Sequence, residues 1–139
     1  MPVNGHSFDW DELLMYIADR RVIPVIGKDL LLVQINGTEQ SLENYLAGRL
    51  ANVLNVPAEG LPQNFGLNEV ALRHLGNGGK RSKIYASIKT IMDQEEFQIP
   101  ESLNKLAQIT DFKLFISTTF DPLLHQAVNQ ARFPGRIRP

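Results

Sequence analysis

The segment Lys113–Leu124 constrains the fold of this chain more than any other stretch. It begins with an apolar run long enough for a buried strand, made up of Phe112, Leu114, Phe115 and Ile116. The run gives way to the polar residues Ser117–Thr119, and a helical pattern starts after Asp121. Asp121 is a good N-cap acceptor, and Pro122 stands in the first helical turn, where its missing N–H has no partner to lose. We therefore predict a strand, a polar turn and the start of a helix.

A junction of this kind puts hydroxyl groups and free helix N–H groups at the carboxyl end of a strand, where open α/β sheets bind ligands. The alternative is a well-capped junction with no ligand. A second polar turn, Gly27-Lys28-Asp29, favours the ligand site because it follows another apolar run, Val22–Ile26. Both faces of that run are apolar, which predicts a strand covered on both sides in a parallel sheet. We expect the two apolar segments to lie side by side in this sheet. Pro24 argues against a central position because it cannot donate to a ladder.

Apolar residues at helical spacing predict the remaining elements. The expected helices run from Asp9 to about Ala18–Arg20, from Ser41 to Leu54, from Leu67 to Leu75, from Ile84 to Met92, from Pro100 and from Pro122. Asn36-Gly37 is typical of a hairpin turn between two short strands. Because most of these helices fall between the two apolar strands, we predict a helical insert over residues 40–110. Gly76–Lys80 lacks the spacing of a phosphate loop and is interpreted as a loop between helices.

Length and composition limit the possible functions. A chain of 139 residues with 43% apolar and 21% charged residues is typical of one globular domain. A net charge of −1 argues against a general nucleic-acid binder, and no apolar run is long enough to span a membrane. The N-terminus lacks the features of a signal peptide. The sequence has no cysteine, which excludes disulfides, cysteine–zinc sites and thiol nucleophiles. We expect a cytoplasmic protein with no metal, membrane or nucleic-acid partner.

Two strands and a hairpin make a thin sheet, since sheets average about five or six strands. We therefore expect an incomplete α/β domain whose free sheet edge is covered by another copy of the chain or by the continuation of a longer one.

The two strand-and-turn segments together resemble the SIR2-like domains of bacteria, which are often fused to TIR or other modules in anti-phage defence proteins. The similarity rests on Arg21–Gly27 and Phe115–Leu124, separated by an insert that contains Ser41–Leu50, and it spans the chain from about Trp10 to about Val128. It implies a Rossmann-like, three-layer SIR2-like domain over residues 1–139, apparently incomplete, with NAD or an ADP-ribose-type nucleotide as its ligand.

The resemblance also implies a nucleotide loop. Gly27, Lys28 and Asp29 match the loop Gly-Ala-Gly-x-Ser that cradles the NAD pyrophosphate, but only the first glycine is retained. An Asp29 carboxylate about 4 Å from a phosphate would repel it by about 1 kcal/mol in water and about 4 kcal/mol at an effective dielectric constant of 20. Lys28 would offset part of this repulsion if its ammonium group faced the ligand.

The second motif, Thr-Thr-Asn-Tyr-Asp, matches the turn after the later strand. Thr118 stands at a cofactor-binding position, whereas Thr119 and Asp121 stand at the catalytic ones. Thr119 replaces the asparagine, and a hydroxyl group cannot present the donor and acceptor of an amide on two separate atoms. We therefore expect Thr119 not to reproduce the asparagine's role.

None of the three histidines supplies a base. His6 lies in the N-terminal tail, His74 is expected on a solvated helix face, and His125 is expected on the surface one turn into the last helix. The absent cysteines exclude a zinc-dependent protein deacetylase.

Three functions remain open, and whether the chain is an enzyme is left undecided. We favour a degenerate module of an anti-phage protein that serves in oligomerisation or nucleotide sensing. The alternative is an NAD hydrolase that depletes cellular NAD. A third option is a nucleic-acid contact through Arg132, Arg136 and Arg138, although arginines in a tail are usually solvated.

Overall fold

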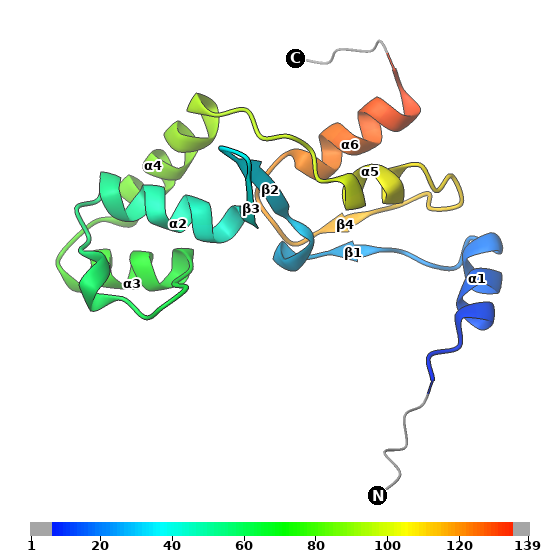
Figure 1. The fold of residues 1–139 in the computed structure, drawn as a ribbon, viewed down its shortest axis with the longest axis horizontal. Coiled ribbons are helices and arrows are strands. Elements are labelled where there is room, and N and C mark those ends of the chain that lie inside the picture. The colour runs from blue at the N-terminus through cyan, green and yellow to red at the C-terminus, as the bar shows by residue number, and fades with distance from the viewer. Residues whose placement is uncertain (1–6, 135–139) are drawn as a thin grey trace, which may run out of the picture. The chain divides into compact units, whose positions relative to one another are not determined.

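The structure, a computed structural model, describes residues 7–134. This part of the chain contains six α-helices and two small two-stranded sheets, so the fold is mixed α/β (Figure 1). The chain divides into two compact units. Unit 1 combines Met1–Ile26 with Glu101–Pro139, and unit 2 comprises Gly27–Pro100.

Unit 1 contains the two strands on which the sequence analysis depends. Its elements are α1 (Trp10–Ala18), β1 (Val25–Ile26), α5 (Glu101–Ala107), β4 (Ile116–Ser117) and α6 (Leu123–Arg132). Strands β1 and β4 are parallel neighbours, with Val25 paired to Ile116. The Ile116 N–H donates to the Pro24 carbonyl and the Thr118 N–H to the Ile26 carbonyl, each over 3.0 Å. The prediction that the two segments lie side by side is confirmed.

Both strands are shorter and less buried than predicted, because both residues of β4 and one of the two residues of β1 are exposed. Strand β1 covers two residues rather than Val22–Ile26, and β4 covers two rather than the whole run before Ser117. Pro24 has no N–H to donate, so the ladder ends at this residue. The prediction that both faces of the first strand are covered is wrong, because Ile26 is buried whereas the Val25 side chain is 60% exposed.

The core of unit 1 lies between α5 and α6. It comprises Leu103 and Ala107 from α5, Phe112, and Leu123, Leu124 and Ala127 from α6. Helix α1 begins as predicted, since the Asp9 carboxylate accepts a hydrogen bond from the Glu12 N–H at 3.0 Å. None of the residues of α1 is buried.

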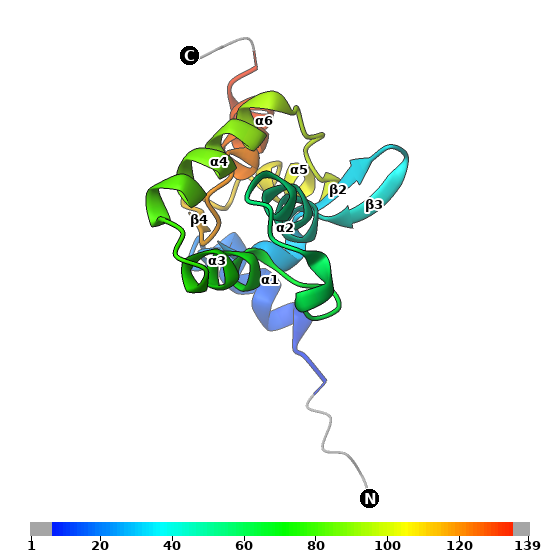
Figure 2. The same cartoon turned by 90° about the vertical axis from the view of Figure 1, so that its left-hand side faces the viewer.

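Unit 2 is built around a central helix. Its strands are β2 (Leu32–Ile35) and β3 (Thr38–Ser41), its helices are α2 (Leu42–Val53), α3 (Leu67–Gly76) and α4 (Arg81–Gln94), and two 3₁₀ turns cover Lys28–Leu30 and Ala58–Gly60. Helix α2 packs against both α3 and α4, and the hairpin projects from the start of α2 (Figure 2). The core of the unit includes Leu42, Leu46, Ala47, Leu50 and Ala51 of α2, Val70 of α3, and Ile84 and Ile91 of α4.

Local signals in the sequence set the hairpin and the start of α2. Asn36 and Gly37 have φ angles of 51° and 80°, as a two-residue type I′ turn requires, so the predicted hairpin is confirmed. The Ser41 hydroxyl accepts a hydrogen bond from the Asn44 N–H, as expected of an N-cap. The Leu42 N–H donates to the Leu31 carbonyl at 2.9 Å and ties the hairpin to the helix. Unit 2 therefore includes the hairpin and ends before α5, so its bounds differ from the 40–110 segment expected as an insert.

Candidate functional site

The polar turn after β4 is stabilised by its own hydroxyl groups. The Thr118 Oγ1 and the Thr118 N–H both donate to the Ile26 carbonyl, at 3.1 and 3.0 Å. Thr118 therefore joins the turn to the end of β1. Its hydroxyl proton is already used within the protein and is not directed at a ligand.

Thr119 pairs with Ser117. The two hydroxyl oxygens lie 3.0 Å apart, and the Thr119 N–H donates to the Ser117 Oγ at 3.2 Å. These bonds close a tight turn of the kind that serine and threonine side chains commonly form. Thr119 thus contributes to the shape of the turn, and no amide stands at its position.

Asp121 stabilises the start of the helix that follows. Its Oδ1 accepts a hydrogen bond from the Leu123 N–H at 2.9 Å, which confirms the predicted acceptor, although Pro122 and not Asp121 occupies the N-cap position. Helix α6 begins at Leu123, one residue later than the placement of Pro122 in the first turn implied. The carboxylate stabilises the positive end of the helix dipole, and this interaction accounts for an aspartate here without a catalytic role.

The other predicted site residues belong to unit 2. Gly27 has a φ of −108° and a ψ of 179°, an extended conformation that any residue adopts. Lys28 and Asp29 begin the 3₁₀ turn. The Lys28 Nζ lies 3.0 Å from the Glu43 Oε2, and the hydrogen bond and negative charge of Glu43 raise the pKa of Lys28. The ammonium group therefore has a carboxylate partner already.

The histidines lie in different surroundings. His6 is outside the described residues. His125 is exposed as predicted, and its Nε2 lies 3.0 Å from the Asn129 side-chain nitrogen. The prediction for His74 is wrong, because this residue is half-buried and its Nε2 is buried without a hydrogen-bond partner in the described chain.

The ring of His74 is covered by the glycine loop after α3. Gly78 has a φ of +86°, and the Gly79 N–H donates to the His74 carbonyl at 2.9 Å, so the loop turns back over the helix end. A Cβ at Gly79 would lie 2.2 Å from the His74 Nε2. Helical periodicity places His74 on a face but does not reveal that a later loop covers it.

Arg132, which was considered for nucleic-acid contact, binds within unit 1. Its guanidinium donates to the carbonyls of Ala107 and Ile109, at 3.2 and 2.9 Å, and its Cζ lies 5.2 Å from the centre of the Phe115 ring. Arginine near the carboxyl end of a helix satisfies carbonyls that lack partners there. Arg136 and Arg138 lie outside the described residues.

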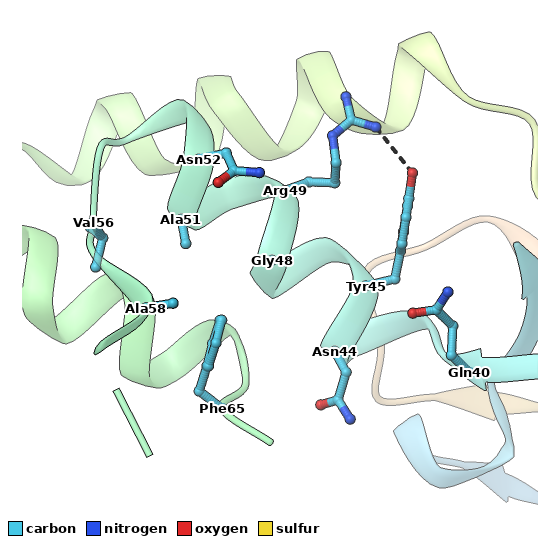
Figure 3. Close-up of a pocket in the computed structure, with 10 residues that line it drawn as sticks. All are labelled: Gln40, Asn44, Tyr45, Gly48, Arg49, Ala51, Asn52, Val56, Ala58 and Phe65. Carbon is cyan, nitrogen blue, oxygen red and sulfur yellow. Dashed lines mark hydrogen bonds between the residues drawn. The ribbon is translucent and has the colours of Figure 1, made fainter. Parts of the chain in front are cut away.

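A groove of about 380 Å³ runs along α2 in unit 2 (Figure 3). Its lining residues are Gln40, Asn44, Tyr45, Gly48, Arg49, Ala51, Asn52, Val56, Ala58 and Phe65. The Arg49 guanidinium donates to the Tyr45 hydroxyl at 3.0 Å, and both groups bind the Glu95 carboxylate. With the arginine charge balanced in this way, the groove offers mainly amide groups and an aromatic ring, which suit hydrogen bonding and stacking rather than acid–base chemistry.

The sequence analysis missed this groove. Tyr45 and Arg49 are four residues apart, so their position on one helix face is readable from the sequence. Glu95 follows α4, and nothing in the local pattern identifies it as their shared partner.

Within residues 7–134, no three histidine, aspartate or glutamate side chains are grouped so as to hold a metal ion. In the same part of the chain, none of the helices has the length and apolar character needed to cross a bilayer. Searches against protein families, curated proteins and solved structures give no match to this chain.

Proposed function

We propose that this chain is a degenerate SIR2-like module of a prokaryotic anti-phage protein, with a Rossmann-like origin and a cytoplasmic location, and that its role is oligomerisation rather than catalysis. The observation that carries the proposal is the number of uncovered apolar side chains in unit 1, on α1 and on the strand pair. They include Phe8, Trp10, Leu14, Met15, Ile23, Val25, Leu114, Ile116 and Phe120. Monomeric proteins rarely leave a large contiguous apolar patch in water, so such surfaces commonly mark interfaces.

The sheet of unit 1 supports the same role. Within the described residues it has two strands of two residues each, and the outer edge of each strand has no neighbour. A strand pair this small is at best marginally stable alone and gains from further cover.

The chemistry of the polar turn argues against catalysis. The Thr118 hydroxyl donates to the Ile26 carbonyl, the Asp121 carboxylate accepts from the Leu123 N–H, and Thr119 carries no amide. A catalytic group needs a free donor, acceptor or lone pair directed at the substrate. We therefore expect no nicotinamide release from NAD.

Nucleotide sensing is the second candidate, with NAD or an ADP-ribose-type compound as the ligand. The observation that favours it is the register of β1 and β4, which end together so that the polar turn follows the carboxyl end of the pair, the ligand side of open α/β sheets. The ion pair between Lys28 and Glu43 weakens this candidate, because it reduces the charge available to a phosphate beside Asp29.

Light scattering of the full chain over a concentration series tests the proposal. We expect a mass that rises from the monomer to a defined oligomer as the concentration increases. A strictly monomeric chain at the highest concentration, with no bound nucleotide, contradicts the proposed role.

Two further measurements separate the alternatives. Calorimetry with NAD and with ADP-ribose tests sensing, and binding without turnover would support it. Incubation with NAD tests hydrolysis: nicotinamide release that is lost in Thr118→Ala and Asp121→Ala would replace the oligomerisation proposal with an NAD hydrolase.

A further inference from the structure

One face of the strand pair in unit 1 is apolar and uncovered. Val25 and Ile116 are register partners, so their side chains lie on the same face of the sheet, where they are 60% and 44% exposed. By strand alternation, Ile23 and Leu114 extend the same face, and they are 51% and 55% exposed. We call these four side chains the open face.

The opposite face is covered except at Ser117. Ile26 on that face is buried, and the Arg132 guanidinium of α6 lies over the ring of Phe115. Phe115 also meets Phe112 edge to face, with ring centres 5.8 Å apart. Parallel strands are normally covered by helices on both faces, so the open face lacks a helix.

Unit 1 also contains a helix whose apolar side chains have no cover. In α1, Trp10 and Leu14 are 66% and 60% exposed, and Met15 is also exposed. No extended contact joins α1 to any other helix or strand of unit 1 within the described residues. An uncovered amphipathic helix and an uncovered strand face are therefore present in the same unit.

The connection between α1 and β1 has a defined geometry. Arg20 takes a left-handed conformation with a φ of 60°, and the Arg21 N–H donates to the Tyr16 carbonyl at 3.0 Å, which closes the helix in a Schellman-type end. Pro24 then favours an extended conformation at Ile23. This connection sets the direction in which the chain leaves α1. It holds α1 away from the open face of its own unit, since the apolar side chains of both α1 and the open face are exposed.

We propose that α1 of one copy covers the open face of a second copy, and that the exchange is reciprocal. This inference rests on the proposed role in oligomerisation and names its surface. Reciprocal exchange is the usual geometry of a swapped dimer, since each copy supplies the same helix and receives the same helix.

The available area is sufficient for such a dimer. The four side chains of the open face, together with Phe8, Trp10, Leu14 and Met15, are each exposed by 44% or more. At roughly 150–200 Å² for a large apolar side chain, half-exposed, these eight offer about 700 Å² per copy, close to the roughly 800 Å² per partner of a standard interface.

Cysteine cross-linking tests the exchange directly, because the sequence contains no cysteine of its own. Leu14→Cys and Val25→Cys are made in separate chains and mixed under mild oxidation. We expect a disulfide-linked heterodimer of the two variants. As a matched control, Leu72→Cys, at a 69% exposed position of α3, should give little linkage to Val25→Cys. A chain carrying both Leu14→Cys and Val25→Cys that links within a monomer overturns the exchange in favour of cover by its own helix.

Opposite charges introduced on α1 and on the open face give a second, independent readout. We expect Leu14→Lys and Val25→Glu each to be monomeric, and an equimolar mixture to recover the dimer, because the lysine of one copy then faces the glutamate of the other. Both positions are at least 60% exposed, so each variant should fold, which circular dichroism checks. Emission from Trp10, the one tryptophan, should shift to the blue on dimerisation.

The outcomes separate the inference from the proposed function. If the wild-type chain is monomeric at every concentration, oligomerisation itself fails. If the wild type assembles and both charge variants assemble equally well, the proposed function stands and the exchange through α1 is wrong. If these surfaces bind another protein and not a second copy, the two charge variants remain monomeric when mixed. Each variant then also fails to bind a protein from the native host that the wild-type chain binds. This outcome overturns the exchange.

Discussion

Helices α1 and α2 share a capped, amphipathic pattern and differ in what surrounds them. Both begin with a side-chain cap, from Asp9 and Ser41, and both carry apolar residues at helical spacing. Helix α2 buries five residues in unit 2, whereas α1 buries none in unit 1. An amphipathic pattern therefore determines that a helix forms, but its burial depends on whether neighbouring elements offer a complementary surface.

The two units differ in the same way as a whole. In unit 2, α3 and α4 both pack on α2 and complete a core around it. In unit 1, α5 and α6 pack on each other and leave the open face without a helix. Four measurements test this contrast between a unit that covers its own core and one that does not.

The largest expected effect comes from truncating a core leucine of α2. Leu50→Ala should lower the free energy of unfolding by about 3 kcal/mol, because Leu50 is fully buried and its removal leaves a cavity. The matched change in α1, Leu14→Ala, should cost about 0.5 kcal/mol or less in the monomer. Urea unfolding at low protein concentration measures both. Equal losses of stability at the two positions would show that α1 contributes to the core of the monomer as much as α2 does.

A smaller loss is expected at the loop that covers His74. Gly79→Ala should destabilise unit 2 by about 2 kcal/mol, because the new methyl group would overlap the imidazole ring. Gly76→Ala is the control, since beyond its chain neighbours and its own helix backbone no atom lies within 4 Å of a Cβ there, and it should be neutral or slightly stabilising. Thermal unfolding of both variants, and of Gly79→Ala combined with His74→Ala, checks the cause. The double variant should recover part of the loss; no recovery would mean that the ring is not the obstacle.

In unit 1, the cap of α6 should have a moderate effect. Asp121→Ala removes the acceptor of the Leu123 N–H and should cost about 1 kcal/mol, whereas Asp121→Asn retains an acceptor and should cost less. Urea unfolding monitored by circular dichroism measures the loss for both variants. A loss of activity toward NAD in place of a loss of stability would contradict the capping role.

The smallest expected effect is the pH dependence of the ion pair in unit 2. Glu43 raises the pKa of Lys28 above its ordinary value of 10.5, so the folded protein holds this proton more tightly than the unfolded chain. The pair therefore stabilises the fold fully below the unfolded pKa and loses that contribution as the pH rises through the higher folded value. Thermal midpoints measured from about pH 9 to about pH 12 should fall more steeply for the wild type than for Glu43→Gln. The difference is small because Lys28 is exposed to solvent. Parallel curves would show that the pair does not contribute.

Local signals in the sequence predicted local structure well. The Asn36-Gly37 turn and the caps at Asp9, Ser41 and Asp121 all form, because each depends on one or two residues and the backbone beside them. The sequence also predicted that β1 and β4 are neighbours in a parallel sheet, because two apolar runs each end in a polar turn.

Features that depend on distant residues were not predictable in the same way. The exposure of Val25 and the cover over His74 depend on which elements happen to pack nearby. The sequence placed Thr118 and Asp121 correctly at the turn after a strand and predicted Asp121 as an acceptor, but it did not reveal that the Thr118 hydroxyl donates to the Ile26 carbonyl of the neighbouring strand. The bond from Arg132 to the end of α5 was missed because its two ends are more than twenty residues apart.

The division of unit 1 into two segments affects the order in which the chain can fold during synthesis. Thr118 donates to Ile26 across 92 positions of the chain, whereas the contacts of unit 2 all lie within one continuous segment. Loop closure over such a separation is slow, and nascent chains fold from the N-terminal side as they emerge. Unit 2 can therefore form before β4, the strand that pairs with β1, has been synthesised. During that interval the apolar residues before Gly27 are accessible to chaperones. The rate at which the ribosome translates the intervening segment determines how long these residues stay accessible.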